Sequence, residues 1–187
     1  RHESPLIFPA LVFSGSVRRA ARPTCGPRGR ANDESRSRGA FIAPVEASAS
    51  SSQAGAGRTP RKTIDGSGWD ESSPGSAIWV HSSNIWDGNN MWNGDWNSWL
   101  RYDLGKTFHV MGFHAWNYNE PGWTNRGIKE VTVSASEDGE TYTPVGDFSL
   151  LEASGKDNDK GQVFAFPKAV NARYFKLHIK SNHRGGE

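Results

Sequence analysis

The residues best suited to bind a ligand lie together near the middle of the chain. They combine aromatic rings, planar amides and one guanidinium, and they are Trp116, Asn117, Tyr118, Asn119, Trp123, Asn125 and Arg126. An aromatic face offers an apolar surface, and amide and guanidinium groups offer hydrogen-bond donors at its edge. A sugar ring has an apolar face and a rim of hydroxyl groups, so this combination of side chains suits a sugar.

Two strands are expected to hold these residues in an exposed loop. An apolar run over residues 108–115 predicts the first strand, which we extend to residue 118. Apolar and polar residues alternate over residues 128–133 and predict the second strand. Pro121 and Gly122 are a turn signal between the two. The predicted ligand-binding side chains therefore lie on a loop that joins two antiparallel strands.

The rest of the chain shows many short strands and no helical periodicity of useful length. The other predicted strands are residues 41–49, 99–105, 131–136, 141–145, 163–166 and 173–179. The range 131–136 overlaps the strand that follows the loop. A turn at Asp138 and Gly139 predicts that the strands on either side of it form a hairpin. Large rings are needed to close a small sandwich, so we assign Trp92 and Trp99 to its core. The expected fold is all-β, an antiparallel β-sandwich.

Composition divides the chain into a tail and a domain. Residues 1–40 contain eight arginines and three acidic residues, whereas residues 41–187 contain 14 basic and 17 acidic residues. We predict a disordered Arg-rich tail, or an uncertain leader, over 1–40 and a folded domain over 41–187. The domain lacks the basic field of a nucleic-acid-binding protein, and no apolar run approaches the roughly 18 residues of a membrane span. Cys25 is the only cysteine, so no disulfide can form within the chain.

A tight polar loop over residues 64–70 contains two carboxylates, those of Asp65 and Asp70. Oxygen-rich loops of this kind can hold calcium through side-chain and backbone oxygens. An Asp-Gly turn with a self-satisfied carboxylate explains the same residues. Their spacing alone leaves both interpretations open.

Four motifs together give a specific resemblance. In chain order they are Asp65-Gly66, WLRYDLGK at residues 99–106, VSASEDGETYTPV at residues 133–145 and ARYFKL at residues 172–177. Over about residues 44–184, they resemble the discoidin domain, which is the coagulation factor 5/8 type C family and includes family 32 carbohydrate-binding modules. The Trp-Asn-Tyr-Asn and Asn-Arg-Gly-Ile-Lys segments look like a bacterial subset found in large secreted or surface proteins that degrade polysaccharides.

The resemblance implies a jelly-roll β-sandwich of the galactose-binding-like type, with ligand-binding loops at one end. By position, the family's sugar-contacting residues correspond to His81, Asn117, Asn119, Asn125 and Arg126. The stacking platform would be Trp116, Tyr118 or Trp123. The ligand would be a glycan or polysaccharide, and the domain would be part of a larger multidomain protein.

The resemblance also implies a structural calcium ion. Asp65 matches the family's calcium-binding Asp, with backbone carbonyls near Thr63 and Gly68, and Asp70 stands where the family usually has a Thr ligand. Two family features are missing: the closing strand, expected after Glu187, and the disulfide that brackets animal members. Without the closing strand, we expect an unpaired sheet edge and an incomplete metal shell.

The favoured function is a non-catalytic carbohydrate-binding module of a secreted or cell-surface bacterial protein. A glycosidase would need two carboxyl groups about 5 to 10 Å apart. The candidate carboxylates lie among Gly and Asn residues, where turns explain them, and they are Asp87, Asp95 and Glu120. A cell-surface adhesion or protein-interaction module of the same fold is the alternative. The loops are rich in Asn and nearly free of Lys, which favours a sugar over an anionic lipid surface.

Overall fold

The computed structural model describes residues 11–16, 40–50, 59–65, 98–119, 121–156 and 159–184. Its strands are β1 (Leu11–Ser16), β2 (Ala40–Ile42), β3 (Glu46–Ala49), β4 (Trp99–Ala115), β5 (Ile128–Ser136), β6 (Thr143–Ser149) and β7 (Gln162–Asn182). The same ranges contain the 3₁₀ helices η2 (Pro60–Thr63) and η3 (Thr124–Arg126). All the strand pairings are antiparallel, which confirms the all-β prediction. The described part of the chain has no helix with the length and apolarity of a transmembrane segment.

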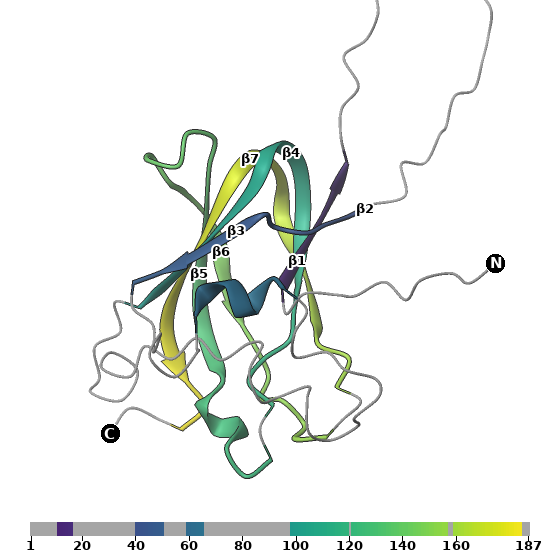
Figure 1. Cartoon of the computed structure of the whole chain (residues 1–187), viewed down its shortest axis with the longest axis vertical. Coiled ribbons are helices and arrows are strands. Elements are labelled where there is room, and N and C mark those ends of the chain that lie inside the picture. The colour runs from purple at the N-terminus through teal and green to yellow at the C-terminus, as the bar shows by residue number, and fades with distance from the viewer. Residues whose placement is uncertain are drawn as a thin grey trace, which may run out of the picture.

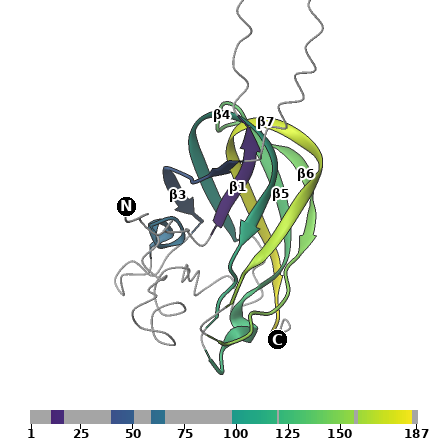
Figure 2. The same ribbon diagram turned by 90° about the vertical axis from the view of Figure 1, so that its right-hand side faces the viewer.

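The long strands β4 and β7, of 17 and 21 residues, build both layers of the sandwich. The strand order is β2-β1-β4-β7-β5-β6, and β3 also pairs with β4. The first part of β4 pairs with the last part of β7, and the last part of β4 with the start of β7. Between the two parts both strands arch over together, at the top of Figure 1. The side view in Figure 2 shows how this arch rolls the sheet into a sandwich, so the predicted fold class is confirmed.

The predicted breaks within β4 and β7 are bends rather than strand ends. Gly105 has φ of 82°, which glycine adopts at little cost, and its N–H donates to Asp103 Oδ1 at 2.6 Å. Arg173 Nε and Nη2 donate to Asp103 Oδ1 and Oδ2, each at 2.7 Å. This guanidinium holds the pKa of the Asp103 carboxyl below its ordinary value. The two bends are thereby fixed to each other, and the chain turns without leaving the sheet.

The predicted hairpin is confirmed. β5 and β6 pair antiparallel across a turn that contains Asp138 and Gly139. Asp138 Oδ1 accepts hydrogen bonds from the N–H groups of Glu140 at 2.8 Å and Thr141 at 2.9 Å. These bonds stabilise the turn and hold the pKa of the Asp138 carboxyl below its ordinary value.

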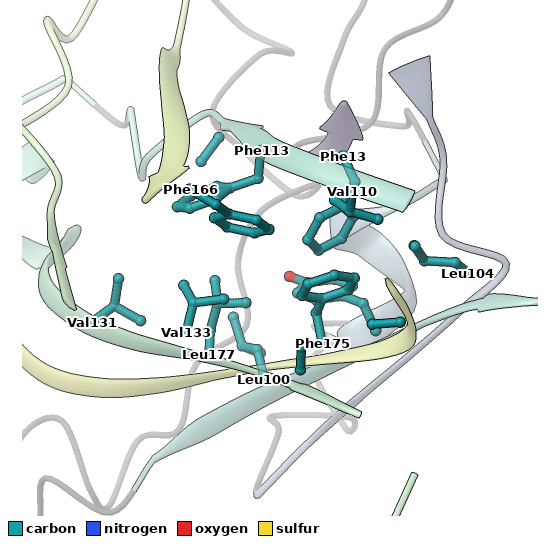
Figure 3. Close-up of a cluster of buried hydrophobic side chains, with 14 of the residues drawn as sticks. Phe13, Leu100, Leu104, Val110, Phe113, Val131, Val133, Phe166, Phe175 and Leu177 are labelled. Carbon is teal, nitrogen blue, oxygen red and sulfur yellow. The ribbon is translucent and has the colours of Figure 1, made fainter. Parts of the chain in front are cut away.

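The hydrophobic core fills the space between the two layers. Figure 3 shows side chains of one layer, including Phe13, Phe113 and Phe166, facing Val133 and Leu177 of the other. Phe113 stacks on a neighbouring ring in β7, that of Phe164, with centroids 4.8 Å apart. Burying a side chain of this size stabilises the fold by about 1.5 to 3 kcal/mol. The packing of the core therefore fixes the position of the two layers relative to each other, and with it the ends of the strands that carry the loops.

Residues 11–16 correct the prediction of a disordered tail over 1–40. They form β1, which lies between β2 and β4 in the sheet. Phe13 is 0% exposed, and its ring stacks on Phe175 with centroids 4.4 Å apart. The physical reason is long-range, because the segment LVFSGS pairs with the last part of β4 and places the ring of Phe13 in the core. The arginines around it gave the whole segment the average composition of a disordered tail.

Trp99 corrects a second prediction, that its ring belongs to the core. Successive side chains of a strand point to opposite faces, and Leu100 and Tyr102 are the buried ones. Trp99 therefore lies on the outer face, half-buried, with the ammonium of Lys176 5.0 Å from its ring centroid. Trp92, the other ring assigned to the core, lies outside the described residues.

Candidate functional site

Two connecting segments meet at one end of the sandwich. The loop of residues 116–127 joins β4 to β5 and includes η3, which is drawn at the bottom of Figure 1. The segment between β6 and β7 is described over residues 150–156 and 159–161, and its first part lies against this loop, as shown by the hydrogen bond from Thr124 Oγ1 to Glu152 Oε1 at 2.5 Å. The structure thus brings the predicted ligand-binding residues of 116–126 to one end. The other predicted positions, His81, Asp87, Asp95 and Glu120, lie outside the described residues.

Asn117 is a buried clamp at the base of the loop. Its Nδ2 donates to the carbonyl oxygens of Ile128 at 2.7 Å and Leu151 at 3.0 Å. Its Oδ1 accepts from the N–H groups of Ile128 at 2.8 Å and Tyr118 at 3.0 Å. These four bonds use the full capacity of an amide. A Cβ on Gly127 would lie 2.6 Å from Asn117 Oδ1, so glycine leaves the space that the clamp needs.

Asn119 is a second clamp, which holds the loop to the segment after β6. Its Nδ2 donates to the carbonyl oxygen of Lys156 at 2.7 Å, and its Oδ1 accepts from the N–H of Gly155 at 2.7 Å. Asn117 and Asn119 are only 8% and 3% exposed. The structure therefore corrects the expectation that these two amides face a sugar, because both are buried and bonded to backbone groups.

The tip of the loop is open to solvent. Trp123 is 46% exposed, and the guanidinium carbon of Arg126 lies 3.9 Å from its ring centroid, a cation–π contact. η3 sets this geometry, since the N–H of Arg126 donates to the carbonyl of Trp123 at 3.0 Å. Asn125, between them, is half-buried and its amide oxygen is covered. The tip thus presents an indole surface and a guanidinium whose position is fixed by that indole.

His114, Trp116 and Tyr118 form a second aromatic row, on the outward face of the extended chain. All three are half-buried, and the rings of His114 and Trp116 stack with centroids 3.8 Å apart. His114 Nε2 lies 2.8 Å from the carbonyl oxygen of Lys160, which can only accept, so the ring proton is on Nε2. Burial lowers the pKa of His114 and favours its neutral form. The sequence prediction missed His114, although its place two residues before Trp116 in an alternating segment could have indicated it.

The predicted calcium ligands are only partly described. Gly68 and Asp70 lie outside the described residues. Thr63 is 4% exposed and its hydroxyl donates to the carbonyl of Pro60 at 2.7 Å, while Asp65 Oδ2 lies 3.7 Å from the ammonium of Lys62. Within the described ranges, no three His, Cys, Asp or Glu side chains lie close enough to hold a metal ion. The Asp65 carboxylate and the Thr63 carbonyl are oxygen donors of the kind calcium prefers, so a calcium site here stays a prediction.

The sequence match agrees with the architecture. The fold is an antiparallel β-sandwich of the galactose-binding-like type. The family model of the F5/8 type C domain matches residues 46–187, a range that holds β3 to β7 and the connecting segments at the loop end. The chain belongs to the F5/8 type C domain family. β1 and β2 lie before the matched range.

Several solved structures are similar to this chain. One is the CBM32 of AlyQ in complex with 4,5-unsaturated mannuronic acid, with 22% identity, 74% of this chain and 84% of that chain covered, and a TM-score of 0.47. Another is CpGH89CBM32-5 from Clostridium perfringens in complex with GalNAc-beta-1,3-galactose, with 18% identity, 73% of this chain and 84% of that chain covered, and a TM-score of 0.47. A third is the lectin domain of lectinolysin complexed with Lewis B antigen, with 20% identity, 76% of this chain and 86% of that chain covered, and a TM-score of 0.47. A search of curated proteins found no match.

Proposed function

We propose that this protein is a non-catalytic carbohydrate-binding module that holds a sugar at the loop end of its sandwich. The observation that carries the proposal is the indole of Trp123, which is 46% exposed and has Arg126 over its ring. The loop below it is anchored by buried amides, so the ring is presented from a rigid base. Binding residues are commonly found on loops that a rigid scaffold positions.

Binding would combine stacking with directional hydrogen bonds. The apolar face of a sugar ring stacks on the open indole surface of Trp123, and Arg126 donates to the hydroxyl groups. Trp116 and Tyr118, in the same loop between β4 and β5, offer a second stacking surface. For a ligand of about 12 heavy atoms, roughly −0.3 to −0.5 kcal/mol per atom gives about −4 to −6 kcal/mol. The expected Kd is therefore between about 1 mM and tens of micromolar.

An affinity in this range suits a module that works beside others. Linking a weak binding module to a second one raises the overall affinity through effective concentration. We therefore propose that the domain serves a larger secreted or cell-surface protein and keeps that protein on a polysaccharide. The loop end supplies the contact, and the parent protein supplies the other binding or catalytic domains.

The proposal is tested by titrating the chain with glycans and following its tryptophan fluorescence. We expect saturable binding to at least one neutral glycan, and a loss of that binding in Trp123→Ala. Phe41→Ala is the matched control, because Phe41 is another large exposed ring, 58% exposed, on β2. Binding that is lost equally in both variants, or in neither, would contradict a site at Trp123.

A structural calcium ion is a separate proposal that rests on Asp65 and the Thr63 carbonyl. If calcium binds the folded chain, the melting temperature should rise with added calcium and fall with chelator. Asp65→Asn should remove the response. Asp147→Asn is the control, because the Asp147 side chain is 71% exposed and pairs with Lys180 rather than with residues near Thr63. If added calcium does not change the melting temperature of the unmodified protein, the proposal of a structural calcium ion is wrong.

A further inference from the structure

A second cluster of aromatic and cationic side chains lies on the outer face of the sheet. It consists of Trp99, Arg101, Tyr142 and Lys176, and we call it the sheet-face cluster. The ammonium of Lys176 lies 5.0 Å from the ring centroid of Trp99 and 4.7 Å from that of Tyr142. All four residues are half-buried. The charge of Lys176 is therefore held between two rings at the surface of the protein.

This cluster is separate from the loop end. Lys176 is paired with Ser134 of β5, six residues along that strand from Ile128, where the loop of residues 116–127 ends. At about 3.4 Å per residue, this places the two regions roughly 20 Å apart along the sheet. A ligand on one region would not touch the other unless it were a long chain.

Two cations of the cluster face each other without a carboxylate between them. Arg101 lies directly opposite Lys176 in the register of β4 and β7, and like charges in such positions destabilise a sheet. Other cations on nearby positions are neutralised: Arg173 by Asp103 at 2.7 Å and Lys180 by Asp147 at 2.8 Å. The Asp103 carboxylate attracts Arg101 electrostatically but is bonded to Arg173, and among the described residues no carboxylate lies within ion-pair distance of Arg101 or Lys176.

The hydroxyl groups beside these two cations do not neutralise them. Arg101 Nε donates to the hydroxyl of Ser48 at 3.1 Å, and the Tyr142 hydroxyl also lies beside the guanidinium. A guanidinium has five N–H donors, so donors remain for a further acceptor. On the other side, Lys176 is paired with Ser134 of β5. The cluster thus has two positive charges, two rings and hydroxyl neighbours, so a ligand that fits it should bring a negative charge and an apolar face.

We propose that the sheet-face cluster is a second binding site, and that it takes an acidic glycan made of uronic acid units. The carboxylate of a uronate would lie between Arg101 and Lys176 and relieve their repulsion, with the guanidinium able to bind it through two nitrogens. The apolar face of the sugar ring would stack on the ring of Trp99 or Tyr142. A neutral sugar would gain only the stacking, and a small inorganic anion only the charge. This site does not depend on the loop end proposed above.

The matched pair of ligands for the test is a homogalacturonan oligosaccharide and its fully methyl-esterified form, titrated calorimetrically into the full chain. The two have the same rings and linkages and differ in charge. We expect the acid to bind and the ester to bind at least tenfold more weakly, because charge-assisted contacts are lost. Binding of the acid should weaken as salt is added, since salt screens charges near the surface. Equal binding of acid and ester would overturn the proposal.

The matched pair of variants is Lys176→Gln and Lys180→Gln, which remove neighbouring lysines from the same strand. We expect Lys176→Gln to weaken uronate binding about tenfold and Lys180→Gln to leave it unchanged, because Lys180 already pairs with Asp147. Arg101→Gln is the second test of the cluster, and melting curves check that each variant is folded. A loss in Lys180→Gln equal to that in Lys176→Gln would overturn the assignment.

Two further titrations distinguish the sheet-face cluster from the loop end and from a site for any anionic chain. Trp123→Ala should keep its affinity for the uronate oligosaccharide, whatever happens to neutral glycan binding at the loop end. If Trp123→Ala loses uronate binding, the acid binds at the loop end and the sheet-face assignment is wrong. A sulfated oligosaccharide of the same length tests the kind of anion, and binding of the sulfated chain alone would overturn the assignment to uronates.

Discussion

The inner and outer parts of the loop between β4 and β5 use their polar side chains in opposite ways. On the inner side, Asn117 and Asn119 are 8% and 3% exposed and bond to the backbone. At the outer tip, Trp123 is 46% exposed and Arg126 lies over its ring. One loop thus contains both its own anchor and its own contact surface. Substitutions in the two parts should separate the stability of the fold from the binding of a ligand.

The largest effect is expected for Asn117→Ala, on stability. The substitution removes the side-chain partner of both the N–H and the carbonyl of Ile128, in part-buried bonds, while the carbonyl of Leu151 keeps the Gln162 amide as a donor. Each such group costs about 1 to 3 kcal/mol when it is left unpaired, so we expect the free energy of unfolding to fall by about 3 kcal/mol. Urea denaturation measures this change.

Asn125→Ala is the control for that substitution, because Asn125 is a half-buried amide of the same type that lies in η3 at the tip, away from the base of the loop. Its free energy of unfolding should change by less than about 1 kcal/mol. Similar losses in the two variants would mean that the inner amides are not special anchors, and the comparison between the two parts would fail.

The next effect is expected for Trp123→Ala, on binding. Removal of an exposed aromatic platform should weaken neutral glycan binding by about tenfold or more. The free energy of unfolding should stay within about 0.5 kcal/mol of the unmodified protein, because the ring is not part of the core. Titration and denaturation of the same sample measure both quantities. A marked loss of stability would show that the indole supports the loop, and the division between anchor and contact would not hold.

The sequence contained enough information to predict the inner anchors, although we predicted them as ligand contacts. Phe113 and Ala115 are buried on β4, and side chains alternate between two faces along an extended chain. Continuing the same alternation puts Asn117 and Asn119 on the buried side and Trp116 on the open side. Residue type suggested a sugar contact, whereas periodicity gave the direction of each side chain. The same rule would have placed Trp99 outside the core, next to the buried Leu100.

Other features could not be read from local pattern. The all-β class and the hairpin at Asp138 follow from alternation and turn residues, and both were predicted. β1 was missed because its six residues form a strand only through pairing with β4, about 100 residues away in the sequence. The contact between Arg126 and Trp123 depends on the 3₁₀ turn of η3, which places the two side chains together. Long-range pairing and loop geometry of this kind need the folded chain.

A smaller effect is expected for Arg126→Lys, and it sharpens the definition of the contact surface. Lysine keeps the positive charge but lacks the planar guanidinium that lies flat on the indole and donates in two directions. We expect neutral glycan binding to weaken about three- to fivefold, with Arg126→Gln weaker still. Calorimetric titration of both variants measures the difference. If lysine substitutes fully, the tip needs only a charge near the ring, and hydroxyl recognition must come from other residues.

The smallest effect is expected from His114, which lies at the end of β4 and stacks on Trp116. Burial lowers its pKa in the folded protein below the ordinary value of 6.5, so the unfolded chain takes up the proton more readily. The free energy of unfolding should therefore be highest above about pH 6.5 and fall as the pH drops toward the folded pKa. His114→Gln keeps a donor for the Lys160 carbonyl but does not titrate. We expect the melting temperature of the unmodified protein to drop by a few degrees more than that of the variant between neutral and mildly acidic pH. If the melting temperatures of the two proteins change in parallel with pH, the His114 ring is protonated freely in the folded protein. His114 and Trp116 would then belong to the exposed contact surface.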